Sequence, residues 1–158
     1  MVLISSETPP RPAEPPADAA GPGPWSASWS QRQSLLERQH QILSDRIAAQ
    51  ILAANAGAGD PQALAEHGRR SRQLLWKLRL HLRLEERWLA ACGCLCPGHR
   101  ASHQLVVQQA EAGLNKAATD PQRQLNWLRV LQAWLLEHTG GPDAHAYGQA
   151  RSLSHCQP

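Results

Sequence analysis

The amino-acid sequence predicts an all-α protein, an antiparallel four-helix bundle of up-down-up-down topology. Four segments carry apolar residues at steps of three and four, the spacing of amphipathic helices. Short breaks containing glycine or proline separate the segments, and short connections make neighbouring helices antiparallel. Strand signals are nearly absent, because the chain has no Phe, one Tyr and few runs of β-branched residues.

The start of the chain differs in composition from the rest. Residues 1–24 hold seven of the twelve prolines, with Ala, Gly, Ser and Glu between them. Such a segment cannot bury enough apolar surface to offset the entropy lost on ordering, so we expect a disordered Pro/Ala-rich tail. We expect residues 25–150 to form the bundle and residues 151–158 to be a frayed C-terminus.

Start and stop signals place the first three helices. The first is expected over about residues 31–55, where Ala-Gly-Ala-Gly-Asp-Pro interrupts the pattern. The second is expected over about 61–91, with a proline in its first turn and a glycine- and cysteine-containing loop after it. The third is expected over about 99–118.

The fourth helix has the clearest start. Asp120 is expected to cap it and Pro121 to occupy its first turn. The apolar pattern continues to His138. Gly140-Gly141-Pro142 is then expected to halt the helix, with Asp143 capping a short terminal turn.

Composition and charge narrow the classes of function. The net charge of the 158 residues is only +3, and no apolar run approaches the roughly 18 residues that a membrane span needs. The opening MVLISSETPP lacks the basic and apolar regions of a secretory signal, so a cytoplasmic protein without membrane contact is expected. We interpret the arginines between positions 69 and 87 as a solvated helix face, because no nucleic-acid-binding motif accompanies them.

Polar residues occupy positions where each helix should bury apolar ones. The expected buried stripes are Leu36, His40, Leu43, Ile47 and Ile51; Leu74, Leu78, His81, Glu85 and Trp88; His99, His103, Val106, Ala110 and Leu114; and Trp127, Leu131, Trp134 and His138. Every stripe contains at least one histidine, and the second adds a carboxylate. Buried imidazoles and carboxylates are costly unless they are paired, hydrogen-bonded or bound to metal. Five such histidines on four helices are hard to explain separately.

These polar groups should meet at one end of the bundle. His40 is about ten residues into the first helix, or roughly 15 Å from its start. His81 and Glu85 lie near the end of the second helix, the third begins at that same end, and the fourth finishes there. The predicted metal ligands are His40, His81, Glu85, His99, His103, His138 and Asp143.

The ligand types limit the choice of metal. Nitrogen and carboxylate ligands without a thiolate suit iron, manganese or zinc. Seven ligands are too many for one tetrahedral zinc. Five imidazoles and two carboxylates suit two six-coordinate ions that the carboxylates bridge.

A second candidate site is the loop that holds Cys92, Cys94 and Cys96. A C-x-C-x-C segment could bind a soft metal or respond to oxidants. Its spacing is not C-x-x-C and no fourth ligand is evident, so we keep it as a secondary hypothesis.

Four motifs carry the predicted ligands in chain order. They are Glu37-Arg-Gln-His40; His81-Leu-Arg-Leu-Glu85, followed by Glu86; His99-Arg-Ala-Ser-His103; and Trp134-Leu-Leu-Glu-His138, with Asp143 five residues later. Together with Trp25 upstream, this pattern resembles the hemerythrin and bacteriohemerythrin family over about residues 25–147. Each motif alone is weak, whereas the four in this order are specific.

The resemblance implies a non-haem di-iron centre, Fe²⁺ or Fe³⁺, with an oxo or hydroxo bridge. The implied roles are His99, His103 and His138 on one iron, His40 and His81 on the other, and Glu85 and Asp143 bridging both. The iron with two histidines would keep an open position for reversible binding of dioxygen, for carriage, storage or delivery. On this basis the chain is not expected to be an enzyme, and its ligand is dioxygen. The sequence identifies no protein partner.

Other functions of the same residues stay open. The centre could sense oxygen, nitric oxide or redox state, or it could handle iron. A di-iron oxidase is a weaker alternative, because ferritin-like oxidases use two E-x-x-H motifs and only Glu37 and His40 have that spacing. A bundle whose histidines bind no metal is the remaining alternative.

Overall fold

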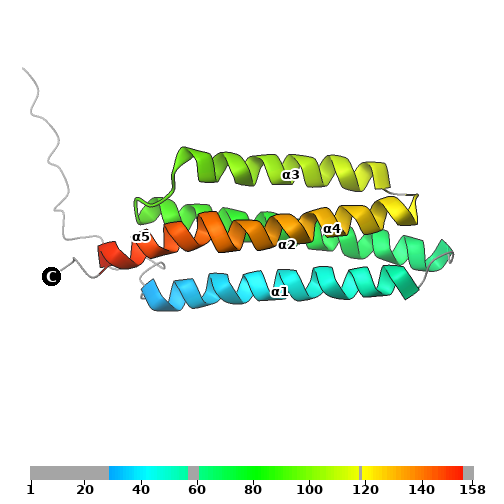
Figure 1. Ribbon diagram of the computed structural model, residues 1–158, viewed down its shortest axis with the longest axis horizontal. Coiled ribbons are helices and arrows are strands. Elements are labelled where there is room, and N and C mark those ends of the chain that lie inside the picture. The colour runs from blue at the N-terminus through cyan, green and yellow to red at the C-terminus, as the bar shows by residue number, and fades with distance from the viewer. Residues whose placement is uncertain (1–28, 57–60, 118, 155–158) are drawn as a thin grey trace, which may run out of the picture.

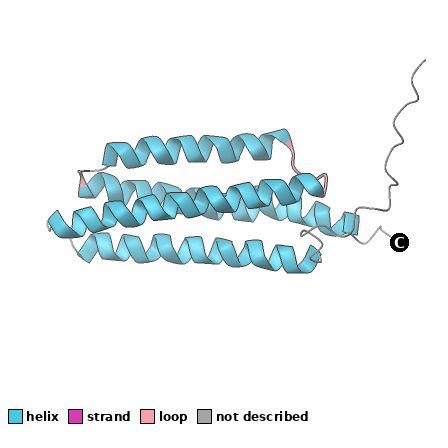
Figure 2. Ribbon diagram, turned by 180° about the vertical axis from the view of Figure 1, so that it is seen from behind, coloured by secondary structure: helices cyan, strands magenta, loops and turns pink. Residues whose placement is uncertain are grey.

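A computed structural model describes residues 29–56, 61–117 and 119–154 of the chain. Its elements are α1 (Trp29–Ala56), α2 (Pro61–Ala91), α3 (Pro97–Ala117), α4 (Pro121–His138), a π-helical turn (Thr139–Asp143) and α5 (Ala144–Ser154). Figure 2 shows that all regular structure in these residues is helical, which confirms the predicted all-α class. The predicted tail, residues 1–24, and the last four residues of the chain lie outside the described residues.

The four long helices lie side by side along one axis (Figure 1). α1 and α3 each pack against both α2 and α4. In Figure 1 the chain runs from left to right in α1 and α3 and from right to left in α2 and α4. The start of α1, the end of α2, the start of α3 and the end of α4 therefore share one end of the molecule. Among the described residues, no helix combines the length and apolar character that crossing a bilayer requires.

Two apolar clusters fill the interior. Between them lies a layer of polar side chains, called the polar layer below, which consists of His40, His81, Glu85, His99, His103, His138 and Asp143. The larger draws on all four long helices and includes the fully buried Ile47, Leu74 and Leu128. The smaller contains Leu36, Trp88, Leu89, Cys94, Ala146, Tyr147 and Ala150. Along α1, Leu36 belongs to the smaller cluster, His40 to the polar layer and Leu43 to the larger cluster. The two clusters and the layer therefore follow one another along the axis of the bundle.

Burial follows the stripes expected from the sequence. All of the predicted stripe residues are buried except His40, Ile51 and Trp134, which are partly exposed. The period of 3.6 residues therefore identified the inward face of each long helix, polar positions included.

Helix starts depend on local caps. The Asp120 carboxylate accepts the backbone N–H groups of the second and third residues after it, at 2.9 and 3.1 Å, which confirms the predicted cap of α4. α3 begins at Pro97, two residues before the predicted start. There the Cys96 Sγ accepts the backbone N–H of His99 at 3.3 Å, so a thiol takes the capping position that Ser or Asp usually occupies.

The expectation that Gly140-Gly141-Pro142 halts the helix is wrong. α4 ends at His138 as predicted, but the chain passes through the π-helical turn directly into α5, and Asp143 lies inside that turn rather than capping a new one. A proline removes a backbone donor and crowds the carbonyl four residues earlier. The wider π turn, whose bonds span five residues, accommodates both effects. α5 therefore continues the line of α4 (Figure 1).

We predict that Gly113→Ala destabilises the bundle. A Cβ at this position would lie 2.7 Å from Cδ1 of Trp127, whose indole N–H donates to the Ala110 carbonyl at 2.9 Å. The free energy of unfolding should fall by about 1–3 kcal/mol in urea denaturation, although alanine favours a helix by about 1 kcal/mol over glycine. Gly148→Ala is the matched control, since its Cβ would meet nothing within 4 Å. Equal effects of the two substitutions would contradict the close approach of α3 and α4.

Candidate metal centre

The polar layer brings the seven predicted ligands together in two overlapping groups. Within each group the possible ligand atoms lie within 4.8 Å of one another. The larger group is Glu85, His99, His103, His138 and Asp143, and the smaller is His40, His81 and Glu85. Glu85 belongs to both groups, so the two are adjacent.

Helical spacing accounts for most of this convergence. His81 and Glu85 on α2 are four residues apart and so face the same side, as do His99 and His103 on α3. His40 reaches the layer from α1.

The π-helical turn brings Asp143 into the layer. In an α-helix, side chains five residues apart point about 140° away from each other. Because the bonds of a π turn span five residues, His138 and Asp143 come to the same side. Their closest polar atoms, Nε2 and Oδ1, are 3.0 Å apart.

Asp143 faces both groups, one oxygen to each. Its Oδ1 lies 3.0 Å from Nε2 of His99 and 3.0 Å from Nε2 of His138. Its Oδ2 lies 3.2 Å from Nε2 of His40, which belongs to the smaller group.

Glu85 is arranged differently. Its Oε1 accepts the Tyr147 hydroxyl at 2.5 Å. Its Oε2 lies 3.6 Å from Nε2 of His103 and 3.8 Å from Nε2 of His81, one histidine from each group. A single oxygen of Glu85 therefore points between the two groups.

Two histidines are oriented by acceptors outside the layer. Nδ1 of His81 bonds to Oε1 of Gln39 at 2.9 Å, and Nδ1 of His103 bonds to Oε1 of Glu86 at 3.0 Å. Amide and carboxylate oxygens only accept, so Nδ1 carries the proton in both rings. The lone pair of Nε2 is then directed into the layer, the tautomer that binds a metal.

His138 is held in two ways. Its ring stacks on Trp134, with centroids 4.4 Å apart and planes 19° apart. Its Nδ1 lies 3.4 Å from the Ser102 hydroxyl, and its Nε2 points to the other histidines of the larger group.

Burial lowers the pKa values of two of the histidines and so favours their neutral form. The pKa of His81 falls to about 3 because of desolvation and the neighbouring His40, and that of His103 falls to about 3 because of desolvation and the neighbouring His138 and His99. Both imidazoles are therefore neutral near pH 7 and able to bind a cation.

The two carboxyl groups shift in opposite directions. Desolvation, together with the negative charge of Asp143, raises the pKa of Glu85 to about 9. Burial alone would raise the pKa of Asp143, but the close imidazoles of His138, His40 and His99 outweigh it and hold that pKa below the usual range. Without a cation, the layer therefore keeps a proton on Glu85 at neutral pH.

Several buried atoms of the layer lack a hydrogen-bond partner. They are Nε2 of His40 and His81, Oε2 of Glu85, and both carboxylate oxygens of Asp143, whose contacts are close but lack hydrogen-bond geometry. Each unpaired buried polar group costs roughly 1–3 kcal/mol. All of these atoms are possible ligands, so a cation in the layer would satisfy them together. The residues fit a metal, and the layer could hold a metal ion.

The cysteine loop does not supply ligands to this layer. In the described part of the chain, two groups of residues could hold a metal, and neither contains a cysteine. Cys94 is buried in the smaller apolar cluster, Cys92 is half-buried, and Cys96 is exposed. The redox hypothesis for this loop stays a prediction.

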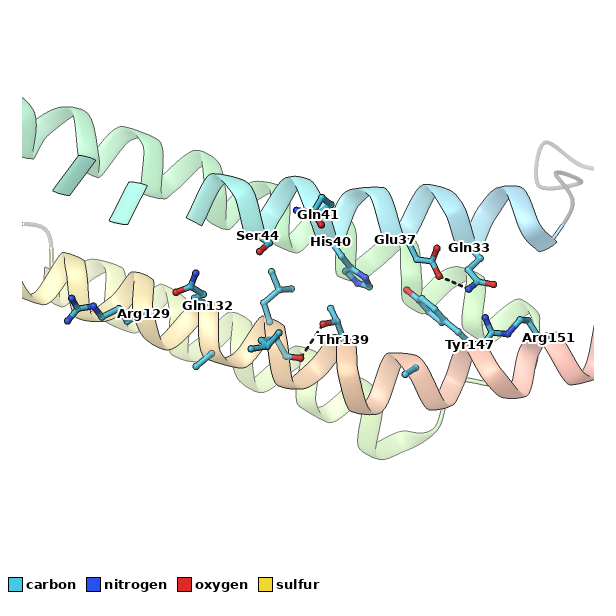
Figure 3. A pocket seen from close by; sticks show the side chains of 14 residues that line it. Gln33, Glu37, His40, Gln41, Ser44, Arg129, Gln132, Thr139, Tyr147 and Arg151 are labelled. Atoms are coloured by element: carbon cyan, nitrogen blue, oxygen red, sulfur yellow. Dashed lines mark hydrogen bonds between the residues drawn. The ribbon is translucent and has the colours of Figure 1, made fainter. Parts of the chain in front are cut away.

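A groove reaches the layer from the surface between α1 and the α4–α5 segment (Figure 3). Its volume is about 650 Å³. Its lining includes Gln33, Glu37, Gln41, Ser44, Gln132 and Thr139. In Figure 3, His40 and Tyr147 face each other across it. The His40 side chain is 14% exposed, whereas the other six predicted ligands are between 0 and 3% exposed.

The sequence assigned no role to the residues that orient the ligands, although Gln39 and Glu86 stand within or beside the four motifs. Gln39 and Ser102 each precede a predicted ligand, but consecutive helical side chains point about 100° apart. Gln39 therefore bonds to His81 on α2, and Ser102 lies against His138 on α4. The sequence carried no signal for such contacts between helices.

Comparison with protein-family models, curated proteins and solved structures found no match. What the layer can bind therefore follows from its own side chains.

We predict that metal binding releases a proton from Glu85. Because its pKa is about 9 in the metal-free protein, Glu85 is protonated at pH 7 and must ionise to bind a cation. Affinity should therefore rise from pH 7 to pH 9. Calorimetric titration with Co²⁺ in buffers of different ionisation enthalpy measures the released proton. Glu85→Gln should abolish the release, and wild-type binding without release would contradict the shifted pKa.

We also predict that Glu86→Ala weakens metal binding although Glu86 lies outside the two groups. The substitution removes the acceptor that fixes the tautomer of His103, which typically costs about 10- to 100-fold in affinity. Glu111→Ala is the control, because Glu111 lines the same face of α2 and α3 but pairs with Arg79. Competition with a chelator measures both affinities, and equal values would count against the orienting role.

Proposed function

We propose that the chain is a non-haem di-iron protein of the hemerythrin type that binds dioxygen reversibly. The observation that carries this proposal is the pair of overlapping ligand groups, which share Glu85 and both face Asp143. His40 and His81 lie outside the five-residue group, so a second ion is needed to use them. The helix directions in Figure 1 support the up-down-up-down topology that such a centre requires.

The spacing of ligand atoms supports six-coordinate ions. Nε2 of His138 lies 2.8 Å from Nε2 of His103 and 3.1 Å from Nε2 of His99. At a metal–nitrogen distance of about 2.1 Å, ligands at a right angle are about 3.0 Å apart and ligands at a tetrahedral angle about 3.4 Å. The observed spacing fits the right angle of an octahedral ion, which favours iron or manganese over tetrahedral zinc.

The two ions would have unequal protein ligands. His99, His103 and His138 would hold one ion, and His40 and His81 the other, with Glu85 and Asp143 facing both. The ion with two histidines has fewer protein ligands and lies beside the groove, so an external ligand would bind there. Ferrous ions bound in the layer would supply the electrons for reversible dioxygen binding.

The chain's own residues would protect that chemistry. Trp134 covers one face of His138, and the two apolar clusters close the layer from above and below. Gln39 and Glu86 hold two imidazoles in the metal-binding tautomer. Glu37, the acid of the E-x-x-H spacing, is exposed and bonds to Gln33, which supports the expectation that the chain is not a ferritin-like oxidase.

The groove favours a second function for the same centre. It is lined by both polar and apolar side chains and opens a route from the surface to His40, the most exposed of the seven residues. Such access suits sensing of oxygen, nitric oxide or redox state, or exchange of iron with the solvent. Long storage of oxygen would instead require a route to the polar layer that excludes water.

We predict two irons per chain and an optical spectrum that changes reversibly with oxygen. The protein is loaded with Fe²⁺ without oxygen, the iron is counted, and spectra are recorded after air is admitted and again removed. Reversal supports oxygen carriage, whereas a stable oxidised spectrum with two irons supports sensing. One zinc, or no metal, would exclude the di-iron centre.

Substitutions test which histidines hold the irons. His40→Ala should retain one iron, because it removes a ligand from the smaller group only. His145→Ala is the matched control: His145 is exposed on α5, two residues from Asp143, and lies in neither group. Two irons retained in His40→Ala would contradict the assignment of the second ion.

A further inference from the structure

An apolar patch is exposed where α1 and α2 pack side by side. Ile42, Trp76 and Leu80 line one hollow of about 220 Å³ between the two helices. They are 42%, 61% and 42% exposed, although tryptophan is usually well buried in a folded protein. Three large apolar side chains exposed together are a feature of interaction surfaces. These three residues are called the Trp76 patch below.

Basic residues of α2 surround the Trp76 patch. Every exposed charged residue on α2 is an arginine, and these arginines extend from Arg69 to Arg87, roughly 27 Å along the helix axis. Arg72 and Arg83, on either side of the patch, form no ion pair with any described residue. Lys77 also lines the hollow, with its Nζ 5.9 Å from the centre of the Trp76 ring.

α1 repeats this arrangement. Arg38 and Arg46 are exposed one turn before and one turn after Ile42. The two acidic residues of α1, Glu37 and Asp45, accept hydrogen bonds from neighbouring glutamine side chains. On both helices, exposed apolar residues are therefore bracketed by arginines.

This pattern of charge discriminates between possible partners. A second copy of the chain would bring one basic face against another, which is repulsive. The backbone of a nucleic acid duplex offers phosphates but no apolar region for the patch. Charges of both signs usually fix the register of two proteins, whereas α2 exposes one sign along its length. A bilayer that contains anionic lipid presents negative headgroups with an apolar region directly beneath them, and so matches both features.

We propose that the face of α1 and α2 around the Trp76 patch binds the surface of a membrane that contains anionic lipid. The three apolar side chains would enter the interfacial region, where tryptophan is favoured, while the surrounding arginines and Lys77 contact lipid phosphates. The sequence predicted no membrane contact because no segment is long and apolar enough to span a bilayer, but binding at the surface needs no spanning helix. Gln39 and His81 also line the hollow, so the bound lipid would lie beside the smaller ligand group.

Sedimentation of the full chain with lipid vesicles tests the proposal. Binding should occur with mixed phosphatidylcholine and phosphatidylserine, weaken as salt is added, and be lost with phosphatidylcholine alone. Trp76→Ala should lower the partition coefficient about tenfold, because less apolar surface leaves water. Val130→Ala is the matched control, since Val130 is also 61% exposed but lies on α4.

The two lysines of the chain provide a second matched pair. Lys77→Gln should weaken binding to the mixed vesicles about fivefold, the usual effect of one basic residue near an anionic surface. Lys116→Gln removes the same charge near the end of α3 and should leave binding unchanged. Wild-type protein that does not bind the mixed vesicles, or Trp76 and Lys77 variants that bind as well as their controls, would overturn the proposal. Tighter wild-type binding to a single-stranded oligonucleotide than to the vesicles would also overturn it.

Fluorescence shows whether Trp76 itself enters the bilayer. Lipids brominated in their acyl chains should quench part of the tryptophan emission of the vesicle-bound wild-type protein. Trp76→Phe keeps an aromatic ring in the patch, so it should still bind but lose that part of the quenching. Equal quenching in the two proteins would contradict the proposed orientation. None of these measurements needs a metal in the polar layer, so their failure is distinguishable from failure of the di-iron proposal.

Discussion

Burial of two carboxyl groups and five imidazoles between two apolar clusters is the constraint on which this bundle depends. The surrounding side chains satisfy only the outward atoms of these groups: Gln39 and Glu86 bond to Nδ1 atoms, and Tyr147 to one oxygen of Glu85. Of the inward atoms, Nε2 of His40 and His81, Oε2 of Glu85 and both oxygens of Asp143 have no hydrogen-bond partner. Water cannot reach most of them, so the unpaired atoms would oppose folding unless a cation binds. Metal binding would thus contribute directly to the stability of the fold.

The sequence allowed the helices and six of the seven residues of the layer to be predicted from the period of the α-helix. Asp143 was included because it follows His138 closely in the chain and matches the last of the four motifs. Regular spacing identifies which side chains face inward, whether they are apolar or polar. The π turn could not be predicted, since Gly140-Gly141-Pro142 carries the usual signal for a helix end. Contacts between helices were equally hidden. The hydroxyl of Tyr147 meets Glu85 across 62 residues of chain, and no local pattern encodes that meeting.

The layer is strongly asymmetric. In the group with three histidines, Trp134 stacks on His138, and all five residues are almost fully buried. The group with two histidines borders the groove. A ligand from the solvent would therefore reach the layer on the side of His40, because the other side is closed to it. The lining of the groove, Gln132 or Ser44 for example, could therefore change without a change in the more buried group of candidate ligands.

The π-helical turn amounts to one extra residue in an otherwise continuous helix. The residues of α5 keep the helical register that the turn sets, so Asp143 at the end of the turn and Tyr147 and Ala150 on α5 all face the interior. Loss of that single residue would rotate these side chains by about 100° and carry a carboxylate, a phenol and an apolar contact away from the bundle at once. Insertions and deletions between Thr139 and Asp143 should therefore be tolerated far less than substitutions there. The length of this short segment would therefore be constrained in evolution, although two of its residues are glycines exposed to solvent.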